Sequence, residues 1–164
     1  MLNKNQVVRF IVGKESFGVD IASVHEIVTV PEITRVPDAP DFLEGVINLR
    51  GKIVSVVDLR KRLRINGTDR HKKNRILVTE IDKKVVGLIV DEVSEVLRLN
   101  PDNIEPPPEM MNSVGAEYIT GVGKLEDKII ILLDMAKVLN HGEINVLGMQ
   151  AAEPNALSHA IPGN

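Results

Sequence analysis

The chain has 164 residues, 43% of them hydrophobic and 26% charged, which is an ordinary globular composition for one domain or two small ones. It contains no cysteine, so disulfides, thiol nucleophiles and cysteine-ligated zinc or iron–sulfur sites are excluded. No apolar run approaches the roughly 20 residues that cross a bilayer. We therefore expect a cytoplasmic protein without direct membrane insertion.

The first half of the chain predicts short strands, because its apolar residues are β-branched or alternate with polar ones. We expect these strands at 7–12, 17–21, 24–30, 46–49 and 52–57. Pro31, Pro37 and Pro40 predict an extended loop over 31–41. Asp58 is a candidate helix N-cap for a short helix that begins at Leu59 and ends near residues 66–67.

The second half repeats this pattern. Strands are predicted at 75–81, 85–90, 93–99, 119–125 and 128–133. Pro101 and the prolines at 106–108 predict a second loop, and Asp134 is a candidate cap for a short helix. We expect residues 149–164 to form a flexible C-terminal tail.

An internal repeat connects the two halves. Residues 43–63 align with residues 119–139 without a gap, and eight of the 21 positions are identical. Weaker echoes match Phe17-Gly18-Val19 to Val86-Gly87-Leu88, and Val24-x-Glu26 to Val93-x-Glu95. Small sheets need closure or a partner to cover their edges, so the repeat predicts two small β-barrels packed side by side. A groove between them is a natural place for a partner to dock.

The turn between the strands at 46–49 and 52–57 holds the main candidate for recognition. Arg50-Gly51 is a two-residue hairpin turn, because glycine accepts a positive φ. The repeat places Glu126-Asp127 at the same turn, so the fold does not require an arginine there. Arg50 is therefore either a recognition residue or a solvated turn charge.

Catalytic motifs are not found in the sequence. The histidines are His25, His71, His141 and His159, and none has the helical i, i+4 spacing of a zinc site. Asp58 and Asp134 could be paired acids, but helix capping explains both. Asp91, Glu92 and Glu95 are expected to be solvated strand residues. The sequence favours a binding module that is not an enzyme and has no cofactor or metal.

A basic stripe extends from Arg60 to Arg75, where eight basic residues face one acid, whereas the remaining chain has 12 basic and 22 acidic residues. Such a stripe is compatible with a solvated loop or with an acidic partner. The alternative function is therefore a β-barrel that binds nucleic acid or an acidic protein through residues 60–75. No aromatic residue lies inside the stripe to stack on bases, so we expect no nucleic acid.

Three segments resemble the CheW-like domain family. They are the segment from Phe42 to Leu59 with its Asn48-Leu-Arg50-Gly51 motif, the segment from Gly87 to Leu97, and Tyr118-Ile-Thr-Gly-Val-Gly123. They occur in the family's order over residues 6–140. The resemblance implies a mainly β fold of two five-stranded SH3-like β-barrel subdomains with short helices.

The resemblance also implies domain boundaries. We expect one domain over 1–148, with a first subdomain at roughly 13–75 and a second at roughly 76–140 that includes the N-terminal strand 6–12.

The function implied is that of a chemotaxis adaptor. It would couple the helical hairpin tip of a chemoreceptor, a methyl-accepting chemotaxis protein, to the regulatory domain of the histidine kinase CheA. We expect a monomer outside the array, recruited to membrane-associated receptor arrays.

The contact residues implied by the resemblance form two groups. Those expected to bind the receptor are Val24, Glu26, Gly45, Asn48, Arg50, Gly51, Ile53 and Val86. Those expected to bind the kinase are Val30, Arg35, Val36, Val54, Val56 and Asp58.

Overall fold

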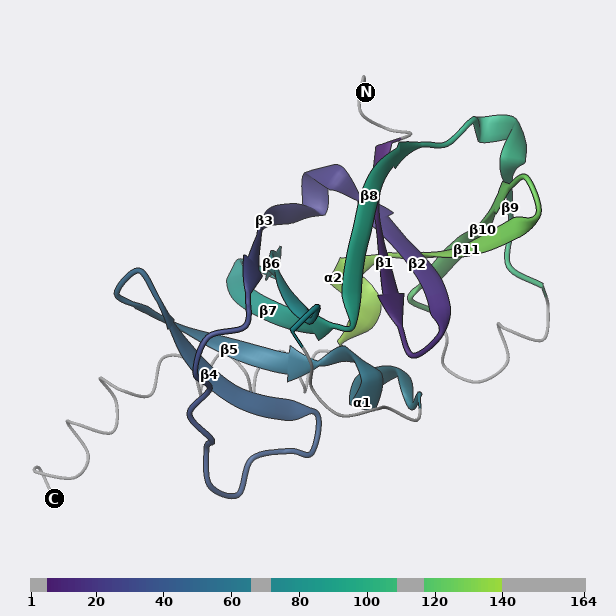
Figure 1. Ribbon diagram of the computed structural model, residues 1–164. Helices are drawn as coiled ribbons and strands as arrows, with labels where there is room; N and C mark the ends of the chain where they lie inside the picture. Colours follow the sequence, from purple (N-terminus) through teal and green to yellow (C-terminus); the bar gives the residue numbers. More distant parts are fainter. Residues whose placement is uncertain (1–5, 66–71, 109–116, 140–164) are drawn as a thin grey trace, which may run out of the picture.

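Two β-sheets make up most of the structure (Figure 1). The computed structural model describes residues 6–65, 72–108 and 117–139. In these ranges the prediction of a mainly β protein with a few short helices is confirmed. The tail expected at 149–164 lies outside the described residues.

The elements of the first half follow the predicted order. They are β1 (Gln6–Val12), β2 (Glu15–Asp20), the 3₁₀ helix η1 (Ile21–Ser23), β3 (Val24–Thr29), β4 (Leu43–Leu49), β5 (Lys52–Asp58) and α1 (Leu59–Leu63). The helix ends earlier than predicted, because Arg64 takes the left-handed conformation with φ 61° and caps it.

The second half contains β6 (Arg75–Ile81), β7 (Lys84–Val90), β8 (Glu92–Arg98), the 3₁₀ helix η2 (Pro101–Asn103), β9 (Ile104–Glu105), β10 (Ile119–Leu125), β11 (Lys128–Leu133) and α2 (Met135–Val138). The sequence predicted all of these except η2 and β9, and it also missed η1. Each of the three missed elements has only two or three residues, too few to show a hydrophobic period.

The structure preserves the repeat in detail. Asp58 and Asp134 both cap their helices, accepting hydrogen bonds from the backbone N–H groups of Arg60 at 3.0 Å and Ala136 at 2.9 Å. The register shifts at Gly45 in β4 and at the equivalent Gly121 in β10. The predicted capping role of the two aspartates is therefore confirmed, and their place in the repeat explains why both are aspartate.

The strands are not divided between the sheets as predicted. Sheet A has the order β8-β1-β2-β11-β10-β9, and sheet B has the order β3-β6-β7-β5-β4. The expected boundary near residue 75 is wrong for β6 and β7, which join the first-half strands, and for β2, which joins the second-half strands. The first hairpin of each repeat, β1–β2 or β6–β7, joins the sheet that contains the remaining strands of the other repeat. Long-range strand pairing of this kind leaves no local signal in the sequence.

Three apolar clusters fill this arrangement. The largest lies between the sheets and includes Phe10, Val57 and Leu88, all fully buried. A second cluster around Val56 and Ile76 belongs to sheet B, and a third around Leu99 and Ile130 belongs to sheet A. Each sheet therefore has an apolar cluster of its own, and the largest cluster is shared by the two sheets.

Candidate functional site

The β4–β5 turn holds Arg50 in the geometry that the sequence predicted. Arg50 has φ 52° and Gly51 has φ 88°, so both turn residues lie in the left-handed region that a tight two-residue hairpin requires. The side-chain oxygen of Asn48 accepts a hydrogen bond from the N–H of Gly51 at 2.7 Å, which stabilises the turn. The turn thus fixes where the arginine side chain begins.

Arg50 forms a two-pronged ion pair with Glu26 on β3. One guanidinium nitrogen donates to Glu26 Oε1 at 3.1 Å, and the other donates to Oε2. Glu26 lies on β3, and Arg50 directly follows β4. Because β3 and β4 are the two outer strands of sheet B, the sheet curls enough for its edges to meet here. The Arg50 side chain is 69% exposed, and a guanidinium has five N–H groups, more than the two that Glu26 accepts.

The pair shifts the pKa of both partners. The hydrogen bond from Arg50, aided by its positive charge, lowers the pKa of Glu26 below its ordinary value despite the opposing effect of desolvation. The hydrogen bond and charge of Glu26 raise the pKa of Arg50. Because both groups lie at the surface, the pair orients the guanidinium more than it stabilises the fold.

We expect acid to break this pair only below the ordinary pKa of glutamate. Since the folded-state pKa of Glu26 is lowered, the contribution of the pair is fully present above the ordinary value and is lost as the pH falls through the lowered one. NMR titration of the Glu26 carboxyl carbon measures this midpoint. In Arg50→Ala the midpoint should move upward, and an unchanged midpoint would contradict the pairing.

The other predicted receptor-binding residues divide by exposure. Ile53 is 39% exposed and pairs with the exposed Asn48 across the hairpin, and Val24 is half-buried at the start of β3. We call Val24, Glu26, Asn48, Arg50, Gly51 and Ile53 the Arg50 surface. Gly45 is buried and Val86 is only 2% exposed in the shared core, so both support the sheet and offer no side chain to a partner.

The predicted kinase-binding residues divide in the same way. Arg35 is exposed, and Val30 and Val36 are half-buried in the segment after β3. In contrast, Val54, Val56 and Asp58 are at most 3% exposed. The protein itself covers these three side chains on the inner strand β5, and their assignment as kinase contacts stays a prediction.

The basic stripe is not a continuous surface in the described residues. Arg60 is buried, with its guanidinium 3.4 Å from Asp91, and Lys61 lies 3.6 Å from Glu44. The Arg62 guanidinium lies 5.7 Å from the ring centre of Tyr118. These cations already neutralise acids or cover an aromatic ring, so the alternative of a nucleic-acid or acidic-protein binder is not supported.

The burial of Asp91 also differs from the prediction. It was expected to be solvated, but it is 6% exposed, and its carboxylate accepts a hydrogen bond from the N–H of Gly13 at 2.5 Å. The sequence offered one signal for Arg60 and Asp91, namely that neither matches its counterpart in the repeat. Nothing in the sequence showed that the two would meet.

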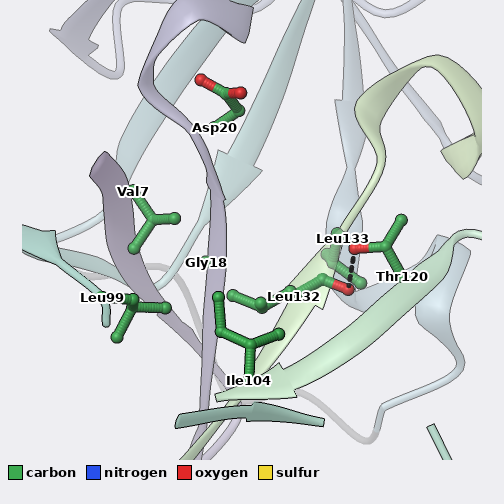
Figure 2. A pocket seen from close by; sticks show the side chains of 8 residues that line it. All are labelled: Val7, Gly18, Asp20, Leu99, Ile104, Thr120, Leu132 and Leu133. Carbon is green, nitrogen blue, oxygen red and sulfur yellow. Dashed lines mark hydrogen bonds between the residues drawn. The ribbon is translucent and has the colours of Figure 1, made fainter. Parts of the chain in front are cut away.

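A pocket lies in sheet A, and Figure 2 shows the residues that line it. It has a volume of about 160 Å³ and is lined by Val7, Gly18, Asp20, Leu99, Ile104, Thr120, Leu132 and Leu133. Asp20 accepts a hydrogen bond from the N–H of Ala22 at 2.8 Å and thereby caps η1. The pocket contains none of the predicted site residues.

Comparison with known proteins decides the family. The family model described as the CheW-like domain matches residues 6–143. The chain belongs to the CheW family. It is 39% identical over 135 residues to the chemotaxis protein CheW of Klebsiella aerogenes, covering 82% of this chain and 81% of that protein. It is 31% identical to the chemotaxis protein CheW of Treponema pallidum, covering 87% and 86% of the two chains.

A solved structure agrees with this assignment. The scaffolding protein TtCheW from Thermoanaerobacter tengcongensis superposes with a TM-score of 0.77 at 39% identity, over 84% of this chain and 88% of that one. The resemblance seen in the sequence motifs is therefore confirmed for the CheW family fold. Among the described residues, no helix is long and apolar enough to cross a membrane.

Proposed function

We propose that this chain is a chemotaxis adaptor that couples chemoreceptor tips to the histidine kinase CheA. Relatives named chemotaxis protein CheW match it over more than four fifths of its length. The observation that carries the proposal is the ion pair between Glu26 and the exposed Arg50, which belongs to the Asn48-Leu-Arg50-Gly51 motif. The role needs two binding surfaces and no catalysis. The adaptor acts in the cytoplasm, as a monomer until it joins a membrane-associated array.

The Arg50 surface is the proposed receptor contact. Val24 and Ile53 supply apolar area, which contributes about 25 cal/mol for each Å² removed from water. Arg50 is held by Glu26 with its guanidinium still largely exposed, so it can donate charge-assisted hydrogen bonds to carboxylate or carbonyl groups of a helical hairpin. The ion pair removes part of the entropy cost of ordering this long side chain on binding.

The proposed kinase contact is the segment from Val30 to Val36. It follows β3 and pairs with β4 through two backbone hydrogen bonds between Thr34 and Val46, of 2.9 and 2.8 Å. Arg35 is exposed on this segment, and its guanidinium lies 3.8 Å from Glu44. A partner barrel docking on this edge would meet a rigid backbone with one cation projecting from it.

The test is a binding assay of Arg50→Ala against a receptor-tip fragment and the CheA regulatory domain. We expect affinity for the receptor fragment to fall by about tenfold or more, the value of a lost charge-assisted hydrogen bond, with kinase binding unchanged. Glu126→Ala is the matched control, because Glu126 occupies the same turn position in the other repeat with φ 50°. Its receptor binding should match wild type.

Two results would contradict these assignments separately. Wild-type protein that binds neither partner would refute the adaptor role. Arg50→Ala protein that is folded and keeps full receptor affinity would leave the role standing but remove the Arg50 surface as the contact.

A further inference from the structure

In the part of the chain that the structure describes, two chain crossings join the sheets, and they lie at opposite ends of sheet A. The first runs from Asp20 in β2 through η1 to Val24 in β3. The second runs from Val90 in β7 to Glu92 in β8 through one residue, Asp91. Asp20 pairs with Val7 at the start of β1, whereas Glu92 pairs with Ile11 near its end. Figure 1 shows the same separation, with η1 far from the start of β8 beside α1.

Asp91 at the second crossing is held from both sheets at once. From sheet A, the Ile11 carbonyl accepts a hydrogen bond from the Asp91 N–H at 2.9 Å, and the Gly13 N–H donates to its carboxylate at 2.5 Å. From the sheet B side, Asn74 donates to the Asp91 carbonyl at 3.1 Å, and the Arg60 guanidinium lies 3.4 Å from Oδ1. Every polar group of this residue therefore contacts a neighbour.

Charge is buried at this crossing. The side chains of Arg60 and Asp91 are each 8% exposed, and that of Asp58, 3.7 Å from Arg60, is 4% exposed. Burying three charges costs free energy that their attraction repays only in a well-fitted geometry. Separating such buried partners leaves uncompensated charge, so the contact opposes any movement of its elements relative to one another. Here the elements it positions are α1, the β7–β8 crossing and the β1–β2 turn.

The first crossing is built differently. Extending the repeat register from Val93-x-Glu95 and Val24-x-Glu26 places Ala22 where Asp91 stands, and Ala22 is exposed. No residue of η1 is buried. Its cap, from Asp20 to the Ala22 N–H, is a contact between near neighbours and joins the crossing to neither sheet face. The half-buried Ile21 and Val24 do pack against the shared core, but apolar packing is not directional. The second crossing is thus held by directional polar contacts and the first by apolar packing.

We propose that the buried Asp91–Arg60 contact is a pivot that fixes the second crossing, about which the two sheets change their relative angle at the first. Val24 and Glu26 of the Arg50 surface lie at the β3 end of the first crossing. A partner bound there therefore contacts the chain where the angle between the sheets changes. This last step rests on the proposed function, whereas the pivot itself is a property of the isolated chain.

The test measures the distance between the sheets without any partner. Because the chain has no cysteine, Lys52→Cys on β5 and Lys128→Cys on β11 place one spin label on each sheet at equivalent exposed positions. Arg60→Met keeps an apolar stem, and Asp91→Asn keeps an acceptor for Gly13 while removing the charge. Each of these two variants should broaden the distribution of distances between the spin labels, measured by pulsed electron–electron double resonance.

The matched control removes a buried polar contact that lies within one sheet. Thr79 is fully buried and donates to the Val86 carbonyl at 3.2 Å inside sheet B, so Thr79→Val should leave the distribution as narrow as in wild type. Folded Arg60→Met and Asp91→Asn proteins with the wild-type distribution would overturn the pivot.

Hydrogen exchange on the unmodified chain gives a second test that no unfolded variant can obscure. The amides of Asp91 and Gly13 should exchange at least about tenfold more slowly than that of Ala22, because opening them requires breaking the polar contacts of Asp91. Equal exchange rates at the two crossings would refute the proposal even if every variant failed to fold.

Discussion

Gly45→Ala should lower the free energy of unfolding by about 3 kcal/mol or more, because backbone strain and collision act together. Gly45 has φ 153°, a conformation that side-chain-bearing residues rarely adopt. A Cβ there would lie 2.9 Å from the carbonyl carbon of Thr34 and collide with its oxygen, and it would lie 2.7 Å from an Ile33 methyl group. The colliding atoms are backbone and are held by the Thr34–Val46 bridge, so they cannot move aside cheaply. Urea unfolding measures the loss.

Gly121→Ala is the matched control for this change. Gly121 occupies the same position in β10, but its φ is not in the positive region, and a Cβ would lie 3.1 Å from the Glu105 carbonyl oxygen. A shift of a few tenths of an ångström in the two-residue strand β9 would accommodate the methyl group. Equal losses in the two variants would show that the contact with Thr34 is not what makes Gly45 necessary.

Arg60→Ala should lower the free energy of unfolding by about 3–5 kcal/mol, because it leaves buried carboxylates without their cation. Asp58 and Asp91 are both within 3.7 Å of the Arg60 guanidinium and are almost fully buried. The cost comes from the unpaired charges, so adding Asp91→Asn to Arg60→Ala should recover part of it. Chemical denaturation of the single and double variants measures both effects.

Lys61→Ala provides the comparison on the same helix. Lys61 lies next to Arg60 and forms an ion pair with Glu44 at 3.6 Å, but its side chain is 41% exposed. Exposed pairs contribute about 0–1 kcal/mol, so this variant should remain close to wild type. If Arg60→Ala lost no more stability than Lys61→Ala, burial of the charges would have to be rejected as the cause.

The strands, hairpin and caps were predictable because their signals are local. The turn at Arg50-Gly51 depends on two adjacent residues, and the capping role of Asp58 depends on backbone groups two residues away. Which strands share a sheet depends on pairings such as Ile131 with Phe17, more than a hundred residues apart, and no period along the chain encodes them. The division into sheets therefore could not be obtained from the strand pattern.

The candidate site was predictable in part for the same reason. The motif identified Glu26 and Arg50 individually, but their ion pair forms only because sheet B curls. Burial was not predictable, since Val86 and Val56 lie on inner strands whose place in the sheet has no local signal, and their assignment as contacts stays a prediction. A sequence motif records which residues a family keeps, and it does not separate side chains that meet a partner from those beneath them.

The exchange of hairpins between the repeats has a consequence for what one repeat could form alone. A single repeat from β1 to α1 contains a hairpin for one sheet and three strands for another, so alone it completes neither. Two copies of that repeat would complete each other, each donating its β1–β2 hairpin to its neighbour. Two separate copies of one such repeat would therefore have to intertwine as a dimer, whereas this chain completes both sheets within one molecule and can carry different residues at the turns of Arg50 and Glu126.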